Sequence, residues 1–247
     1  MSVVPDLTIG ALKETGTEPL PGYDSSLRAA CEAHPPPYGM AWYGDKYREV
    51  ARDASWLANS LIANAAKEGE GSRKLWTLAG RTADRNVAEQ IRRHAIDEAR
   101  HARLYIKMLS IIFPKAVDAN LEVELNKLSP GYTTKDQPPP LPATSAANVL
   151  DEVIQMNIGE IRTRIHQLLL RPVAMAHCAK RERAKLQRVL DSLLSDETSH
   201  IRYTARLIER ASNEGSAKFV KNTMKKRIAE FNKITLQEVG ELSFEGG

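Results

Sequence analysis

The sequence predicts an all-α protein built around a four-helix bundle, in which two helical hairpins are joined by a long crossover and followed by a C-terminal helix. Three observations predict this fold. Apolar residues recur at helical spacing through most of the 247 residues, aromatic residues make up only 6%, and no segment alternates apolar and polar residues as a half-buried strand does. A proline-rich stretch separates two long helical regions, which is typical of a bundle with a crossover.

The N-terminal region, residues 1–44, is rich in proline and glycine and ends in the run His34-Pro35-Pro36-Pro37. Such a composition disfavours long regular elements, so we expect this extension to wrap over the surface or to stay loosely ordered. The helical bundle is expected to span residues 45–212.

The first hairpin is expected over residues 45–113. Apolar residues at helical spacing predict one helix from Lys46 to about Ala79. Thr82 or Asp84 then offers an N-cap for a second helix that reaches Phe113.

The crossover, residues 114–145, carries six prolines with room for one short helix near residues 121–128. The second hairpin, residues 146–212, is expected to have helices over 146–170 and 181–211 with a turn at 172–178. Residues 213–247 form the last region, in which 218–233 predict a basic amphipathic helix before a tail.

Charge and composition exclude several classes of function. The net charge of +4, from 35 Lys and Arg against 31 Asp and Glu, is too balanced to predict a specific nucleic-acid partner. Two cysteines, Cys31 and Cys178, are too few for a disulfide framework or a four-thiolate metal site. The apolar runs are too short to span a membrane, and the N-terminus lacks the pattern of a signal peptide, so we expect a cytoplasmic protein.

A repeated motif carries the predicted chemistry. Asp-Glu-x-x-His occurs in the second helix of each hairpin, once over residues 97–101 and once over 196–200. A spacing of three residues places Glu and His on one helix face, where both reach the same metal ion. The predicted metal ligands from the two copies are Glu98, His101, Glu197 and His200.

Each pair needs one more carboxylate from the neighbouring helix. Residues at equal distances from the turn of an antiparallel hairpin lie at the same height, and the midpoint between Glu70 and Glu98 is residue 84, in the predicted turn. By the same reasoning Glu160 is the partner of Glu197. The alternatives are Glu68 or Glu49 in the first hairpin and Glu152 in the second. Glycine precedes both Glu70 and Glu160, which suggests that space is needed beside a metal.

Four carboxylates and two imidazoles suit two iron ions, with mixed iron and manganese or two manganese ions as alternatives. Asp97 and Asp196 precede the two Glu-x-x-His pairs and are predicted to accept hydrogen bonds from the ligand imidazoles. His94 lies one turn before Glu98 and is either an additional ligand or a nearby histidine that does not bind the metal.

These residues resemble a known family. Asp97-Glu98-Ala99-Arg100-His101 is similar to the Asp-Glu-x-Arg-His element of the oxygen-activating ferritin-like di-iron carboxylate proteins, namely the bacterial multicomponent monooxygenases and acyl-carrier-protein desaturases. The stretch 68–70, which ends 28 residues before Glu98, is also similar to aldehyde-deformylating oxygenases. The resemblance covers about residues 45–212 and implies a ferritin-like bundle.

The resemblance further implies a non-haem di-iron oxygenase or oxidase that uses O2 to hydroxylate, N-oxygenate, desaturate or cleave a small, apolar organic substrate. No flavin or nicotinamide fingerprint occurs, so an external reductase or ferredoxin is the expected electron donor. Basic runs at 181–188 and 218–227 suggest an acidic carrier protein as a partner, and a homodimer is among the assemblies that the sequence allows. The alternative functions are an iron-oxidising or peroxide-scavenging protein and a metal-free helical interaction module.

Overall fold

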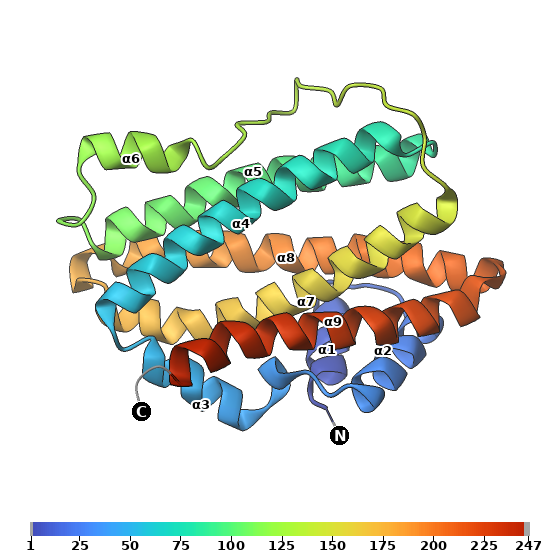
Figure 1. The fold of residues 1–247 in the computed structure, drawn as a ribbon, viewed down its shortest axis with the longest axis horizontal. Helices are drawn as coiled ribbons and strands as arrows, with labels where there is room; N and C mark the ends of the chain where they lie inside the picture. Colours follow the sequence, from blue (N-terminus) through green and yellow to red (C-terminus); the bar gives the residue numbers. More distant parts are fainter. Residues whose placement is uncertain (1, 245–247) are drawn as a thin grey trace. The chain divides into compact units, whose positions relative to one another are not determined.

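A computed structural model describes residues 2–244, with side chains described as far as residue 237. All regular structure in residues 2–244 is helical (Figure 1), which confirms the predicted all-α class. The α-helices are α1 (Val4–Glu14), α2 (Pro21–Ala33), α3 (Ala41–Val50), α4 (Ala54–Arg81), α5 (Arg85–Ile112), α6 (Ala119–Asn126), α7 (Ala146–His177), α8 (Arg183–Ala211) and α9 (Ala217–Phe244).

The chain divides into two compact units. Unit 1 comprises Met1–Glu49, Leu150–Leu169 and Glu197–Gly247, and unit 2 comprises Val50–Val149 and Leu170–Asp196. Helices α7 and α8 each contribute residues to both units.

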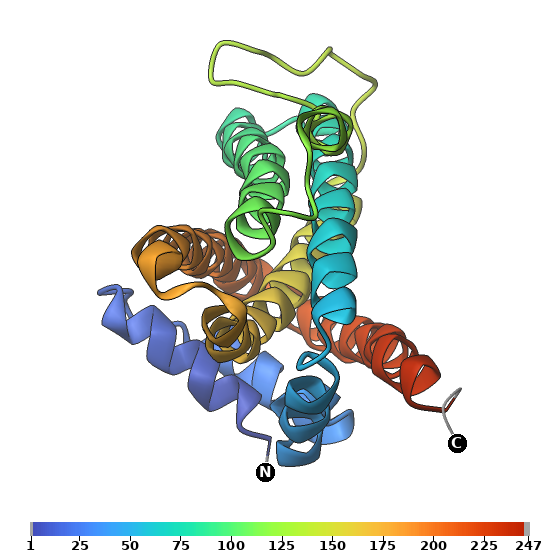
Figure 2. The ribbon, with the colours of Figure 1, turned by 90° about the vertical axis from the view of Figure 1, so that its left-hand side faces the viewer.

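Unit 2 is organised by the pair α4 and α5, which lie side by side in both ribbon views (Figures 1 and 2). The turn predicted near residues 82–84 is present, and Asp84 caps α5 by accepting hydrogen bonds from the backbone N–H groups of Asn86 and Val87. The apolar stripe of α5 is buried as its periodicity predicts, and its fully buried members include Ile91, Ala95 and Ala99.

The single helix expected over residues 46–79 is instead two helices, α3 and α4. The break falls at residues 51–53, because the side chain of Asp53 accepts a hydrogen bond from the backbone N–H of Trp56 and thereby begins a new helix. Apolar periodicity continues across the break, so the pattern alone did not reveal it.

The crossover contains one short helix, α6, close to the predicted position, with Asp118 as its N-cap. The rest of the crossover packs against α4. A Cβ atom on Gly69 would collide with the carbonyl oxygen of Leu128, and one on Gly80 would collide with that of Pro139. Gly69 therefore allows the crossover to approach α4, and it is not there to make space beside Glu70.

The N-terminal extension is helical and partly buried in unit 1, contrary to the expectation of a loosely ordered wrap. Helix α2 packs against α9, and Tyr23 and Leu27 on α2 are fully buried. The Tyr23 hydroxyl donates to Oδ1 of Asn157 at 2.9 Å, and its backbone N–H donates to Glu209 at 2.7 Å. The prolines occupy helix starts and linkers, where a missing N–H costs nothing.

The turn expected at residues 172–178 is also wrong, because α7 continues through Pro172 to His177. Proline removes one helical hydrogen bond, the one that the carbonyl of Leu168 would accept, and the helix continues without it. The final helix α9 extends beyond the predicted 218–233. Gly215, with a φ of 97°, makes the kink between α8 and α9.

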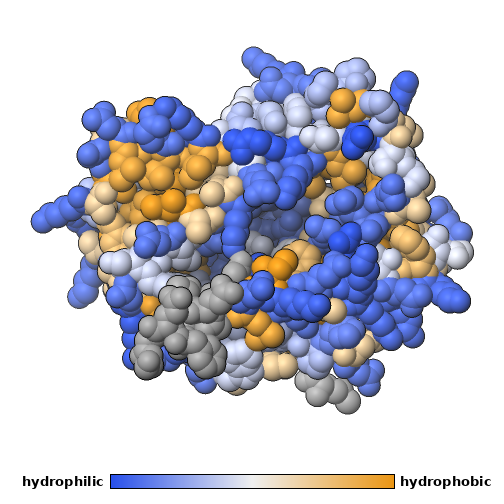
Figure 3. Space-filling view, in the orientation of Figure 1, coloured by the Kyte–Doolittle hydropathy of each residue, from blue (hydrophilic) through white to orange (hydrophobic). Residues whose placement is uncertain are grey.

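The face drawn in Figure 3 is mostly hydrophilic, with apolar residues gathered in separate patches. Within the part of the chain that the structure describes, none of the helices combines the length and the apolar character that crossing a bilayer requires.

Candidate metal centre

Unit 2 contains a cluster of two carboxylates and an imidazole, formed by Glu68 of α4 and Glu98 and His101 of α5. We call it the α4–α5 cluster. One ligand atom from each residue lies within 4.8 Å of the other two. Glu98 and His101 share a helix face because they are three residues apart. The predicted Glu-x-x-His pair is therefore brought together with a carboxylate from the neighbouring helix.

The α4–α5 cluster is shielded from solvent. His101 is fully buried, and its Nδ1 lies 3.3 Å from Oε1 of Glu98. The same carboxylate oxygen lies 3.3 Å from Nε2 of His94, which is 1% exposed. The structure therefore places the imidazole of His94 beside Glu98. Both roles predicted for His94, an additional ligand and a nearby histidine that does not bind the metal, are compatible with this position.

The environment of Glu98 favours its ionised form. Burial by itself would raise the pKa of Glu98, but a hydrogen bond with Glu68 and the proximity of His101 outweigh it and hold the pKa well below its usual range. A buried carboxylate that stays ionised is a good ligand for a cation.

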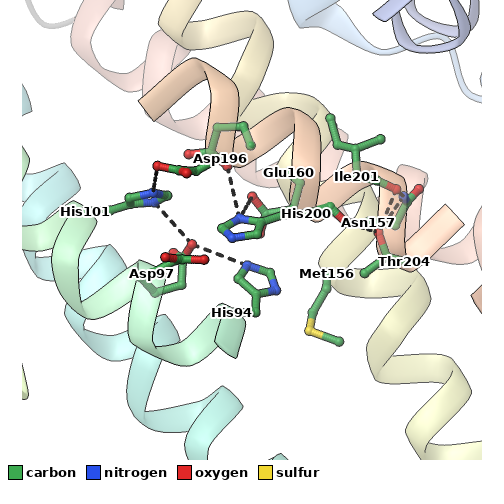
Figure 4. A network of polar contacts seen from close by, with 12 residues as sticks. His94, Asp97, His101, Met156, Asn157, Glu160, Asp196, His200, Ile201 and Thr204 are labelled. Carbon is green, nitrogen blue, oxygen red and sulfur yellow. Dashed lines mark hydrogen bonds and ion pairs between the residues drawn. The ribbon is translucent and has the colours of Figure 1, made fainter. Parts of the chain in front are cut away.

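Asp196 supports His101 from the opposite side of the ring. Its Oδ2 lies 3.3 Å from Nε2 of His101 (Figure 4). The same oxygen accepts a hydrogen bond from Arg100 at 2.5 Å. Burial would raise the pKa of Asp196, but contacts with His101 and Arg100 lower it. An Nε2–H that donates to Asp196 leaves the Nδ1 lone pair of His101 available beside Glu98.

Unit 1 contains a second group, the α7–α8 cluster, formed by Glu160 of α7 and Glu197 and His200 of α8. Nδ1 of His200 lies 3.7 Å from Oε2 of Glu160 and 3.8 Å from Oε2 of Glu197. Figure 4 shows Glu160 and the ring of His200 pointing toward one another. Glu197 is completely buried and His200 nearly so. The predicted ligands of the second hairpin are thus brought together.

A buried amide contacts the α7–α8 cluster. Gln167, 4% exposed, donates from Nε2 to Oε1 of Glu197 at 2.8 Å. Four buried isoleucines of α7 lie on a different face of the helix from Glu160 and belong to the apolar core: Ile154, Ile158, Ile161 and Ile165.

Three predicted or alternative carboxylates lie outside both clusters. Glu70 is exposed and pairs with Lys74, Glu49 is exposed and pairs with Lys46, and Glu152 is exposed. Glu68 takes the position predicted for Glu70. Two residues along a helix turn the side chain by about 200°, so Glu68 and Glu70 face opposite sides of α4. The midpoint calculation locates a height along the helix and does not identify the face.

Two contacts were missed from the sequence. Asp196 was expected to support a ligand imidazole, but its pairing with His101 of the other motif copy could not be read from its own helix. Gln167 carried no motif, although its spacing of seven residues from Glu160 places both on one face of α7. Asp97, the other predicted supporting aspartate, pairs with Arg100 at 3.3 Å.

Each cluster suits a metal ion by its donor chemistry. Bonds from a divalent first-row ion to oxygen or nitrogen are about 2.0–2.2 Å long, so two ligands of one ion lie about 3–4 Å apart. The distances of 3.3 Å in the α4–α5 cluster and 3.7 and 3.8 Å in the α7–α8 cluster fall in this range. No protein-family model, curated protein or solved structure matches this chain.

Proposed function

We propose that the α4–α5 and α7–α8 clusters each bind one metal ion and that the chain is an iron-dependent oxidoreductase of the ferritin-like type, which uses O2 to oxidise a small organic substrate. The observation that carries this proposal is the occurrence of two clusters, each with a buried Glu-x-x-His pair and a half-buried carboxylate from the neighbouring helix. A ferritin-like arrangement of the four long helices α4, α5, α7 and α8 is part of the proposal.

Burial makes a metal-free role for these groups costly. Carboxylates taken out of water lose their hydration, and neighbouring negative charges repel one another. Glu98 is 6% exposed and lies beside the carboxyl group of Glu68 and the imidazole of His101. Glu197 is fully buried and lies beside the amide of Gln167 and the imidazole of His200. A bound cation would compensate the negative charge of these carboxylates directly. A core made only of apolar side chains has no such charge to compensate.

The donor set favours iron or manganese over structural zinc. Thiolates are absent from both clusters, and oxygen donors outnumber nitrogen donors. When bound, the ions supply one-electron redox chemistry and positions that accept O2. The chain's own groups hold the ions, and Asp196 fixes the orientation of one imidazole. The burial of Glu197 and His200 keeps water away from these two donors.

The order of residues on α8 supports a joint role for the two clusters. Asp196 contacts His101 of the α4–α5 cluster, and the next residue in the sequence, Glu197, belongs to the α7–α8 cluster. The proposal includes an external electron donor, which would supply electrons to bound iron. It also includes a small apolar molecule as the substrate.

Metal analysis of the full chain, expressed with ample iron, tests the proposal. We expect about two irons per chain and an optical charge-transfer band that disappears on reduction and returns with O2. Glu98→Ala and Glu197→Ala should each lose iron, whereas Glu70→Ala, at an exposed position of α4, should keep it. Circular dichroism checks that every variant remains helical.

The possible results separate three functions. Iron that cycles with O2 and oxidises apolar test substrates supports the oxidoreductase. Iron that accumulates well beyond two ions per chain, without substrate oxidation, indicates an iron-handling protein instead. Absence of transition metal from the wild-type chain, with unchanged helicity and melting after chelation, overturns the proposal.

A further inference from the structure

The two oxygens of Glu197 have different surroundings. Oε1 accepts the hydrogen bond from Gln167 at 2.8 Å, and Oε2 lies 3.8 Å from Nδ1 of His200. Gln167 and Glu197 are both buried, at 4% and 0% exposure, so water does not compete strongly for this contact. The carboxylate is therefore held in one orientation.

The chemistry of the contact fixes which end of the Gln167 amide faces Glu197. An ionised carboxylate only accepts hydrogen bonds, so the amide must present its N–H group and not its oxygen. A hydrogen bond to a charged acceptor in a dry environment is stronger than an ordinary one. Glu98, the corresponding residue of the α4–α5 cluster, has imidazoles of His94 and His101 beside its Oε1 instead.

We propose that Gln167 is a positioning residue for the α7–α8 cluster: it engages Oε1 of Glu197 so that Oε2 is the oxygen offered to a metal ion. This inference rests on the proposed function, since it presupposes a metal ion at that cluster. Glu197 then binds through one oxygen, in an orientation that the hydrogen bond fixes before the ion arrives. The two bound ions are consequently inequivalent.

Cobalt(II) titration of the full chain tests this inference without relying on activity, because the visible spectrum of cobalt reports its coordination number. Gln167→Met keeps the length and burial of the side chain and removes the donor. We expect one of the two cobalt equivalents to bind about 10- to 100-fold more weakly, the usual cost of losing a residue that supports a ligand. The spectrum of that equivalent alone should change, since Oε1 becomes able to bind.

Gln167→Asn provides a second variant that keeps the amide but shortens the side chain by about 1.5 Å, so the N–H no longer reaches Glu197. It should weaken the same equivalent. Gln155→Met, at a half-buried position of α7 in unit 1, is the matched control and should leave both equivalents unchanged.

The outcomes distinguish the inference from the proposed function. A wild-type chain that binds two cobalt ions, together with Gln167 variants that bind both with unchanged affinity and spectrum, overturns the positioning role and leaves the proposed function standing. Equal weakening by Gln155→Met also overturns it, because the effect would then be general to α7. A wild-type chain that binds no cobalt overturns both.

Discussion

The carboxylate of Asp196 lies 3.3 Å from Nε2 of His101, although the two residues belong to different copies of the Asp-Glu-x-x-His motif. Arg100, the neighbour of His101, donates to the same carboxylate oxygen. This contact holds the imidazole with Nε2 toward the aspartate and Nδ1 toward Glu98, so a residue of one motif copy orients the histidine of the other.

Substitution of Asp196 by Asn should weaken metal binding at the α4–α5 cluster. The amide is a poorer acceptor than the carboxylate, so the orientation of His101 is less well held, and we expect about a tenfold loss of affinity for one metal equivalent. Isothermal titration with iron(II) or cobalt(II) measures it. Asp191→Asn is the control, because Asp191 lies on α8 like Asp196 but is exposed and pairs with Arg171. Equal affinities for Asp196→Asn and the wild type would contradict the assigned role.

Glu68→Gln and Glu70→Gln should behave differently despite being two residues apart. Glu68 lies within the α4–α5 cluster, and Glu70 is exposed beside Lys74. We expect loss of one metal equivalent from Glu68→Gln and a full complement in Glu70→Gln, as measured by metal analysis after gel filtration. The reverse result would restore Glu70 as the ligand and refute the placement of Glu68.

Gly69→Ala should destabilise the fold although alanine is the better helix former. The added Cβ would collide with the backbone carbonyl of Leu128, and displacement of the crossover should cost about 1–3 kcal/mol of unfolding free energy. Gly10→Ala is the control, because a Cβ on Gly10 of α1 meets nothing within 4 Å. It should stabilise the protein by about 0.5–1 kcal/mol. Urea unfolding compares the two, and stabilisation by both substitutions would refute the close contact.

Glu89 should contribute stability that is lost in acid. Its hydrogen bond with Arg92 is the main cause that lowers the pKa of Glu89 from 4.5 to about 2. Because the folded pKa is the lower one, the contribution is complete above about pH 4.5 and is lost as the pH falls through about 2. Glu89→Gln should therefore reduce stability at pH 7, and its effect should shrink steadily between about pH 4.5 and 2.

The size of that effect is modest, since the Glu89 side chain is 38% exposed and solvent screens the pair. We expect about 1 kcal/mol or less at pH 7. Urea unfolding of both chains at a series of pH values measures the difference, and a gap that widens in acid would show that the sign is wrong.

Local sequence patterns predict best the helices that begin at a capping residue. Asp84 and Asp118 begin α5 and α6 as expected of capping aspartates. Composition is misleading in the N-terminal region, because prolines there stand at helix starts. Pro172 is misleading as well, because α7 continues through it.

The sequence by itself determined the all-α class and the residue pairs Glu98 with His101 and Glu197 with His200, because a spacing of three residues fixes a shared face of any α-helix. Only the tertiary structure decided which carboxylate of α4 joins Glu98, that Asp196 supports His101, and that Gln167 holds Glu197. Those choices depend on how each helix is rotated about its axis and on the packing of side chains from distant segments. Spacing within a single helix carries no information about either.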